Sequence, residues 1–379
     1  MTTSHTETRP FNTFPLWRES ASRPLFAIDL EITARCNNAC RHCYINRPPH
    51  DRHARSEEMS IQQIEAILDE ALSLGTLWIL LTGGEPLLRE DFEEIYMRLK
   101  RKGFLVSVFT NATLITEDHI RLFTAYPPRD LEVTVYGVTC ETYERVSRRK
   151  GSFDRFRRGL DLLWANNIHT NLKTTACQSN YAELPRIMDF CRKHGHGPFR
   201  FDPHLHLRFD GDKKRNKEIE GERLTPDEIA ALERRDLKRM EAYENACRKQ
   251  TDTASPSLPE NLFSCGVGRN DCAVSPDGWF RLCPSLWHPD YIYDLKKGSL
   301  KDAWEVFTPR VLSRATIATP EPAPCFTCGI RPICMWCPAH ACLESGKLDA
   351  HVPYFCDVAR KREALLEKKD AAPTAGHAS

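Results

Sequence analysis

Three cysteines stand within eight residues near the start of the chain, in the segment CNNACRHC: Cys36, Cys40 and Cys43. Cysteine thiolates are ligands for zinc and for the irons of iron–sulfur clusters. A closed four-coordinate site would need a fourth ligand nearby, but the next cysteine along the chain is Cys140. The segment therefore predicts a [4Fe–4S] cluster that is held by three thiolates and keeps one iron open to an outside ligand.

A second group holds nine of the sixteen cysteines, between Cys265 and Cys356. Two Cys-x2-Cys pairs within it are the usual signature of a zinc ribbon. Without Cys342, however, eight ligands remain, which is enough for two clusters with four thiolates each. We therefore favour two further iron–sulfur clusters over zinc. Their ligands would be Cys265, Cys272, Cys283, Cys325, Cys328, Cys334, Cys337 and Cys356.

Composition limits the class of protein and its compartment. The 379 residues carry a net charge of +1, which gives no bulk electrostatic reason to expect a nucleic acid partner. No apolar run approaches the roughly 20 residues that span a bilayer, and the first residues lack the apolar core of a signal peptide. We therefore expect a cytoplasmic protein without a membrane partner, whose cysteines are not paired as disulfides.

Strand and helix patterns alternate over the first two hundred residues, which predicts a parallel sheet with helices outside it. The predicted strands are residues 25–33, 76–81, 104–110, 131–136, 169–175 and 199–204, and the helices are 60–74, 91–101, 116–125, 153–166 and 182–194. Six such units form either a doubly wound sheet or a partial barrel, and both place the ligand site at the carboxyl ends of the strands. The cysteine segment, Gly83-Gly84-Glu85-Pro86 and Thr110-Asn111 all follow strands, so they should share one rim.

The rest of the chain divides by composition. We expect an N-terminal arm at 1–24, the sheet-forming domain at 25–207, a charged helical bridge and linker at 208–260, a loop-rich cysteine domain at 261–360 and a disordered tail at 361–379. The densely charged stretch 211–249 reads as a solvated helix, with Pro226 at a favourable first position. About 24 residues before the first strand are too few for a packed domain of their own.

The cysteine segment, the GGEP loop and the sixfold repeat resemble the radical S-adenosylmethionine (radical SAM) superfamily over residues 25 to about 205. The second cysteine group resembles its SPASM extension, which carries two auxiliary [4Fe–4S] clusters. The resemblance implies a partial (β/α)6 TIM-like barrel followed by a loop-rich SPASM domain. It also implies two ligand sets: Cys265, Cys272, Cys283 and Cys337, and Cys325, Cys328, Cys334 and Cys356. Two residues, rather than the usual three, separate Cys334 from Cys337, so Cys342 is an alternative to Cys337.

The resemblance also implies a cofactor and roles for individual residues. The open iron would bind S-adenosylmethionine, whose reductive cleavage yields a 5′-deoxyadenosyl radical that abstracts hydrogen from the substrate. Gly83 and Gly84 would allow close approach of the cofactor, Glu85 would accept a hydrogen bond from its ammonium group, and Pro86 completes that motif. His42 would contact the adenine. Thr110, Asn111 and Thr134 would contact the ribose or the methionine, although strand capping or sheet packing explains them nearly as well.

Members with this pattern mostly modify peptides, so a ribosomally made peptide undergoing cross-linking or epimerisation is the expected substrate. Asp202 or His204 would then be a polar substrate contact or a proton acceptor, unless His204 is a loop residue without a role. A separate leader-binding protein and a reductase such as flavodoxin or ferredoxin are the expected partners. The alternatives are tetrapyrrole modification, sulfatase maturation and a non-catalytic zinc protein. Pro284 stands where sulfatase-maturating members place an aspartate base, which argues against the second of these.

Overall fold

A computed structural model of the chain describes residues 23–251, 261–263, 265–314 and 324–370. Most of the expected arm, at residues 1–22, and the linker at 252–260 lie outside these ranges. Among the helices in the described ranges, none combines the length and the apolar character needed to cross a lipid bilayer.

One sheet of nine strands organises the fold, in the order β6-β5-β4-β3-β2-β1-β7-β8-β9. Each of the first six strands runs parallel to its neighbours, and β7 pairs parallel with β1. The antiparallel strands β8 and β9 complete the open edge, so the barrel does not close. The strands are β1 Ala27–Thr33, β2 Trp78–Gly83, β3 Leu105–Thr110, β4 Asp130–Thr134, β5 Asn171–Thr175, β6 Arg200–Asp202, β7 Asp271–Val274, β8 Trp279–Arg281 and β9 Ile292–Asp294. The partial barrel is confirmed, but its sheet continues into the cysteine-rich part of the chain.

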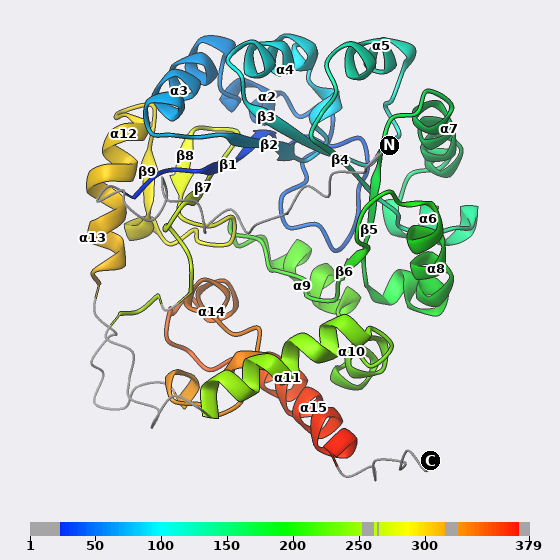
Figure 1. The fold of residues 1–379 in the computed structure, drawn as a ribbon, viewed down its shortest axis with the longest axis vertical. Helices are drawn as coiled ribbons and strands as arrows, with labels where there is room; N and C mark the ends of the chain where they lie inside the picture. The colour runs from blue at the N-terminus through cyan, green and yellow to red at the C-terminus, as the bar shows by residue number, and fades with distance from the viewer. Residues whose placement is uncertain (1–22, 252–260, 264, 315–323, 371–379) are drawn as a thin grey trace, which may run out of the picture.

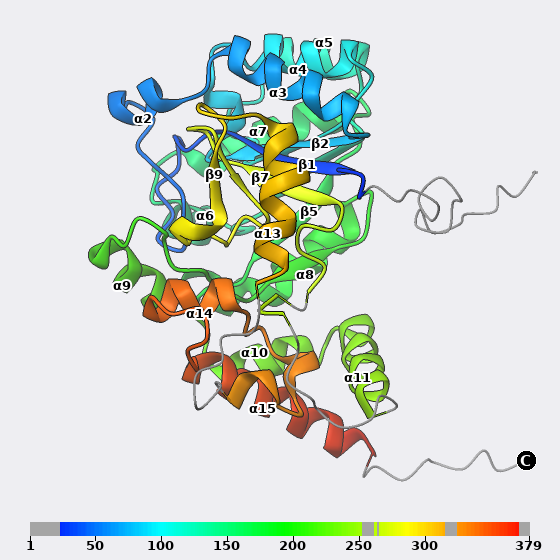
Figure 2. The same ribbon diagram turned by 90° about the vertical axis from the view of Figure 1, so that its left-hand side faces the viewer.

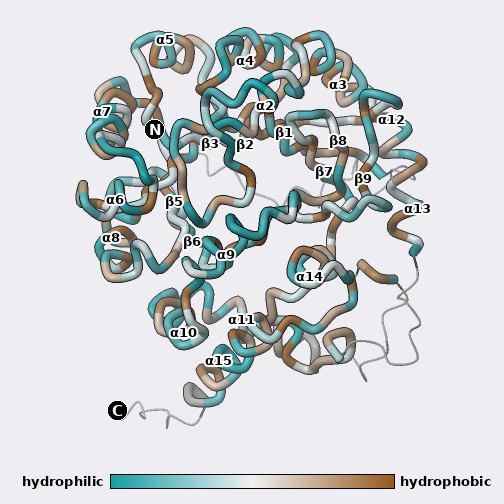
Figure 3. Tube along the Cα trace, turned by 180° about the vertical axis from the view of Figure 1, so that it is seen from behind, coloured by the Kyte–Doolittle hydropathy of each residue, from teal (hydrophilic) through white to brown (hydrophobic). Residues whose placement is uncertain are grey.

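Helices cover the outer face of the sheet (Figure 1). They are α2 Arg52–Glu57, α3 Ile61–Ser73, α4 Phe92–Arg101, α5 Glu117–Ala125, α6 Cys140–Ser147, α7 Ser152–Ala165 and α8 Leu184–His194. Hydrophilic and hydrophobic residues alternate along them, as expected of helices with one buried face (Figure 3). Strand β1 shows the matching alternation, since Ile28 and Leu30 are buried in the core while Asp29 and Glu31 face the inside of the barrel. The two short helices α2 and α6 were not predicted.

The charged stretch after β6 and the end of the chain form a helical layer beside the open side of the barrel (Figures 1 and 2). It contains α9 Lys213–Glu222, α10 Pro226–Glu233, α11 Leu237–Thr251, α14 Pro338–Ser345 and α15 Pro353–Asp370. Two predictions were therefore wrong. The charged stretch forms three helices rather than one solvated helix, and residues 361–370 of the expected disordered tail are helical. The physical reason is a buried ion pair, since Glu233 is 0% and Arg362 2% exposed. The positions of charged residues in the sequence do not by themselves reveal such a pair.

Short helices make up the remaining regular structure. The segment after β9 is a nearly continuous helix, made of α12 Leu300–Asp302, the π-helix η5 Ala303–Phe307 and α13 Thr308–Leu312. The 3-10 turns are η2 Pro86–Leu88, η3 Gln178–Glu183, η4 Pro289–Tyr291, η6 Pro324–Phe326 and η7 Arg331–Ile333. The last of these lies in the proline-rich cysteine region, which has little regular structure of its own, as its composition predicts.

Candidate active site

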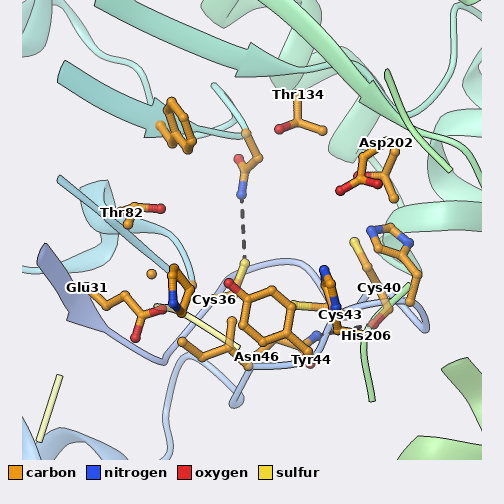
Figure 4. A pocket seen from close by; sticks show the side chains of 18 of the residues that line it. Glu31, Cys36, Cys40, Cys43, Tyr44, Asn46, Thr82, Thr134, Asp202 and His206 are labelled. Carbon is orange, nitrogen blue, oxygen red and sulfur yellow. Dashed lines mark hydrogen bonds between the residues drawn. The ribbon is translucent and has the colours of Figure 1, made fainter. Parts of the chain in front are cut away.

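A cavity of about 340 Å³ opens on the inner face of the barrel. The strands β1 to β6 all contribute to its wall, and so does the loop that follows β1. In Figure 4 the sulfurs of Cys36, Cys40 and Cys43 lie in the lower part of the view, and Thr134 and Asp202 lie above them. The rim predicted from the strand order is thus a real cavity.

The loop that carries the three cysteines is closed at its base. Its ends meet in a bridge between Arg35 and Arg47, with the Cys36 amide donating to the Arg47 carbonyl at 2.9 Å. Arg35 also forms a two-pronged ion pair with Glu58, at 2.7 and 3.0 Å, and both side chains are largely buried. The loop therefore holds its thiols in place through backbone closure and one braced arginine.

The donor set fits an iron–sulfur cluster. Cys36 and Cys40 are 8% and 3% exposed, and burial raises the pKa of both thiols. A cationic metal centre removes that penalty, because a coordinating thiol is deprotonated outright. The Asn111 side chain and the Asn38 amide lie within hydrogen-bonding range of Cys36 Sγ, at 3.9 and 3.4 Å. In the described ranges, no three His, Cys, Asp or Glu side chains are arranged to hold a single metal ion.

Gly83 and Gly84, at the end of β2, line the cavity, but close packing of the backbone is the main reason that both positions require glycine. A Cβ on Gly83 would lie 2.2 Å from the Thr33 carbonyl oxygen, and one on Gly84 would lie 2.2 Å from that of Arg35. The φ of Gly83 is +125°, which side chains rarely adopt. The glycines thus let the second strand's loop press against the cysteine loop.

The role expected for Glu85 needs correction. Its carboxyl is fully buried and, like Pro86, does not line the cavity. It accepts hydrogen bonds from Thr110 Oγ1 at 2.8 Å, from the Asn111 amide at 2.7 Å and from the Leu87 amide at 3.2 Å. Burial nevertheless raises its pKa to about 7. Glu85 therefore positions the Thr110–Asn111 turn, and those two residues face the cavity instead.

Aromatic side chains form the wall beside the thiols. His42 lines the cavity, and burial, with the charge of Arg215, lowers its pKa to about 4, so the ring is neutral at physiological pH. Its ring centroid lies 5.5 Å from that of Tyr136, just after β4. Tyr136 and Tyr44 were missed in the sequence, and the position of Tyr136 at the end of a predicted strand was the available signal. Thr134 reaches the same wall.

Asp202 and His204 also line the cavity, as the strand order predicts. Arg362 Nη2 contacts His204 Nε2 at 2.9 Å, and the same guanidinium binds Glu233. Because arginine only donates, Nε2 must accept and Nδ1 must carry the proton. Burial also lowers the pKa of His204 well below its usual value. His204 is therefore a neutral hydrogen-bond donor through Nδ1, and its role as a proton acceptor is corrected.

Three further charged groups in the cavity were missed. Asp29 and Glu31 project from β1, and Lys173 projects from β5. Glu31 forms a buried ion pair with Arg281, while burial raises the pKa of Asp29 to about 6 and lowers that of Lys173 to about 8. For Asp29 and Glu31 the signal was a charged residue at alternate positions within an otherwise apolar strand, whereas β5 is mostly polar and gave no such signal for Lys173. The three groups make the floor of the cavity polar.

The second cysteine group falls into two places. Cys325, Cys328, Cys334 and Cys356 line one small cavity of about 30 Å³. Cys265 and Cys337 lie near enough to Cys283 to help raise the pKa of its thiol, which is consistent with Cys337 as a member of that set. Cys272 lies on β7 opposite Ile28, packed into the hydrophobic core, and its charged neighbours are Asp29, Asp271 and Arg281. The structure thus brings together seven of the eight expected auxiliary ligands and leaves Cys272 apart.

Comparison with known proteins finds a family match over part of the chain and relatives that extend beyond it. Residues 30–191 match the model of the radical SAM superfamily. The AdoMet-dependent heme synthase of Methanosarcina barkeri is 28% identical over 44% of this chain and 46% of its own length. The antilisterial bacteriocin subtilosin biosynthesis protein AlbA of Bacillus subtilis is 24% identical over 79% of this chain and 64% of its own. The crystal structure of Streptococcus suis SuiB bound to S-adenosylmethionine aligns with a TM-score of 0.61 at 16% identity, over 86% of this chain and 75% of that one.

Residues 30–191 therefore carry a radical SAM domain. The chain's C-terminal cysteine-rich region is consistent with that of the SPASM-type peptide maturases to which it is homologous. The matches span less than two thirds of the length of the first curated relatives, 46% of the heme synthase and 64% of AlbA.

Proposed function

We propose that this radical SAM enzyme modifies a ribosomally made peptide. The observation that carries the proposal is a single cavity lined both by three thiols, two of them buried, and by polar groups of β1, β5 and β6. When bound, a [4Fe–4S] cluster and S-adenosylmethionine supply a 5′-deoxyadenosyl radical that abstracts hydrogen from the substrate. The chain's own residues hold, orient and enclose the reactants.

Residues on the thiol side would hold the cofactors. Cys36, Cys40 and Cys43 would ligate the cluster, and the backbone of Gly83 and Gly84 would lie against the amino acid part of S-adenosylmethionine. His42 and Tyr136 offer neutral aromatic faces for its adenine. Thr110, Asn111 and Thr134 offer polar atoms to its ribose and methionine. Glu85 would hold the turn that presents two of them.

Two polar residues at and after the end of β6, Asp202 and His204, would face the substrate. His204 would donate a hydrogen bond through Nδ1, which has no partner among the described residues. Asp202 is a candidate acceptor for a peptide N–H, because its carboxylate lines the cavity and accepts a hydrogen bond from the His204 amide through only one of its two oxygens. Burial raises the pKa of Asp202, with the His204 amide and nearby arginines opposing the shift.

The length of the aligned regions favours a peptide substrate. The match to AlbA, whose name assigns it to bacteriocin biosynthesis, extends over 312 residues and therefore into the cysteine-rich region. The match to the heme synthase covers 165 residues and supports tetrapyrrole modification less well. SuiB, which shares this fold, has also been solved with its precursor peptide SuiA. Sulfatase maturation is disfavoured because Pro284, which has no acid–base group, lines the cavity at the position expected of the aspartate base.

Two auxiliary clusters complete the proposal, in a cysteine-rich domain that begins near residue 261. One would use Cys325, Cys328, Cys334 and Cys356, which already face a common cavity. The other would use Cys265, Cys283 and Cys337, with Cys272 as its fourth ligand only if β7 shifts to expose that thiol. A leader-binding protein and a reductase are the partners we propose.

Anaerobic reconstitution tests the function. We expect about twelve irons per chain, from three four-iron clusters, and 5′-deoxyadenosine once dithionite is added. Co-expression with candidate precursor peptides, followed by mass spectrometry, should then show a mass change in the peptide. Zinc in place of iron and no nucleoside product would refute the radical enzyme, while a modified tetrapyrrole would refute only the peptide substrate.

A pair of single variants tests the auxiliary ligand after Cys334. Cys337→Ala should lower the iron content by about four atoms per chain, because one four-iron cluster loses a ligand. Cys342→Ala is the matched control and should keep the wild-type iron content, since Cys342 lies in α14 and Cys337 is the neighbour of Cys283. Iron analysis and the absorbance of the clusters report both variants. The reverse pattern would make Cys342 the ligand.

A further inference from the structure

A second cavity, of about 460 Å³, lies on the outer side of the cysteine loop. Its lining is strongly basic: Asn38, Ala39, Asn46, Arg47, Pro48, Arg148, Arg149, Arg208, Asp212 and Arg215. Of these residues only Asn46 also lines the cavity that contains the three thiols. The proposed chemistry gives this basic cavity no role.

The charges of this cavity do not balance. Asp210 pairs with Arg47 at 3.1 Å and with Arg208 at 2.7 Å. Glu218 pairs in the same way with Arg148, at 3.4 Å, and with Arg215. Asp212 adds one more carboxylate, so five guanidinium groups face three carboxylates. Arg149 has no ion pair among the described residues, and its buried Nε has no hydrogen-bond partner there. The cavity therefore carries excess positive charge.

A buried amide on the wall of this cavity also has no partner. Asn38 is 3% exposed, and neither its Nδ2 nor its Oδ1 has a hydrogen-bond partner in the described part of the chain. An unsatisfied buried polar group costs about 1–3 kcal/mol, so native proteins rarely keep one without a ligand or water. Asn38 is thus a second, independent sign that something polar binds here.

The cavity is separated from the thiols by one loop. Asn38 and Ala39 line the basic cavity, while their neighbours Cys36 and Cys40 line the reaction cavity. Arg215 Nη2 donates to the Cys40 carbonyl at 2.8 Å, and Arg208 Nη1 donates to that of Asn46 at 3.4 Å. A partner seated on these arginines would therefore lie directly behind the loop that receives the electron.

We propose that this cavity is the docking site of an acidic one-electron donor protein that carries a reduced flavin or iron–sulfur centre. The proposal rests on the proposed function, which requires one electron for each reductive cleavage. Docking makes and breaks no covalent bond: the donor loses one electron and the enzyme gains it. The interfaces of redox complexes are small and short-lived, and complementary charges on the two proteins steer their encounter. An acidic substrate segment fits this place less well, because the loop separates it from Asp202 and His204.

Binding of an acidic flavodoxin to the reconstituted enzyme, measured by calorimetry at low and high salt, tests the proposal. The double variant Arg148→Gln/Arg149→Gln should weaken binding about tenfold at low salt, with the difference shrinking at high salt because exposed charges are screened. Within the described residues, neither side chain donates a hydrogen bond to the cysteine loop. Asp212→Asn should instead tighten binding about threefold, since it removes a carboxylate and asparagine still caps α9. That gain cannot come from misfolding.

Arg121→Gln on α5 is the control, because it removes one positive charge from a side chain that is 71% exposed and outside the cavity. It should bind flavodoxin as the wild type does. The rate of 5′-deoxyadenosine formation with flavodoxin, divided by the rate with dithionite, should fall in the double variant and not in the control.

Two outcomes would overturn the docking site. One is wild-type flavodoxin affinity in both the double variant and Asp212→Asn. The other is a loss of affinity for the precursor peptide with unchanged affinity for flavodoxin, which would make the cavity a substrate site. Failure of the proposed function looks different: the wild-type enzyme would then form no 5′-deoxyadenosine even with dithionite.

Discussion

Replacing Cys36, Cys40 and Cys43 together by alanine should abolish cleavage of S-adenosylmethionine while leaving about eight irons per chain. The three thiols lie on one wall of the reaction cavity, and the auxiliary cysteines line separate places. Loss of one cluster should therefore not empty the other two. Iron analysis and chromatography of 5′-deoxyadenosine measure the two effects independently, and product should fall below detection.

A control with two other cysteines isolates this effect from general thiol loss. Cys140 is exposed and Cys247 is half-buried, and neither lines a described cavity. Cys140→Ala/Cys247→Ala should keep about twelve irons and wild-type product formation. Retained cleavage in the triple variant would show that these three cysteines do not hold the reactive cluster. Loss of all iron would show instead that the variant fails to fold.

Arg362→Met should destabilise the protein by about 3 kcal/mol, because it leaves the Glu233 carboxylate buried without its main partner. Arg362 and Glu233 are 2% and 0% exposed, and their closest contact is 2.6 Å. Arg239, at 3.1 Å, and the Tyr243 hydroxyl, at 2.9 Å, keep the loss from being larger. The change also frees His204 Nε2. The midpoint of thermal unfolding under anaerobic conditions should fall by several degrees.

Two further variants make this prediction specific. Lys361→Met removes the neighbouring charge, which is 47% exposed and pairs with Asp227, so it should cost less than about 1 kcal/mol. Glu233→Gln/Arg362→Met removes both charges and should be less destabilised than Arg362→Met alone, because no unpaired carboxylate remains. Equal midpoints for Arg362→Met and Lys361→Met would show that the buried pair does not hold α15 to α10.

Hydrophobic periodicity was a reliable guide to the barrel and a poor guide to the helical layer beside it. The first six strands were expected within a few residues of their bounds, because helix and turn signals separate them. Helix α3 was equally readable, since Ser60 and Gln63 form a capping box before an apolar stripe. Helix α15 was missed because Arg362 is stabilised by Glu233, which is 129 residues away in the chain.

The residues of the site likewise fall into those that local sequence patterns identify and those that only the fold reveals. Spacing identified the cysteine loop and the glycine turn, because ligands and tight turns are local features of the chain. The Glu85 carboxyl was assigned to a ligand, and only the folded chain shows that Thr110 and Asn111 occupy it. Tyr136, Lys173 and Arg362 joined the site through strand order and helix packing, which no local pattern records.

By itself, then, the sequence determined the type and spacing of the candidate ligands: three cysteines in one loop, a parallel βα framework that carries them, and a second cysteine group. Tertiary structure alone decided the state of each group. Burial keeps His42 neutral, an arginine from the last helix sets the tautomer of His204, and core packing separates Cys272 from the other auxiliary cysteines. The reason is that ligand type and spacing are written along the chain, whereas desolvation and ion pairing arise between segments that only the fold brings together.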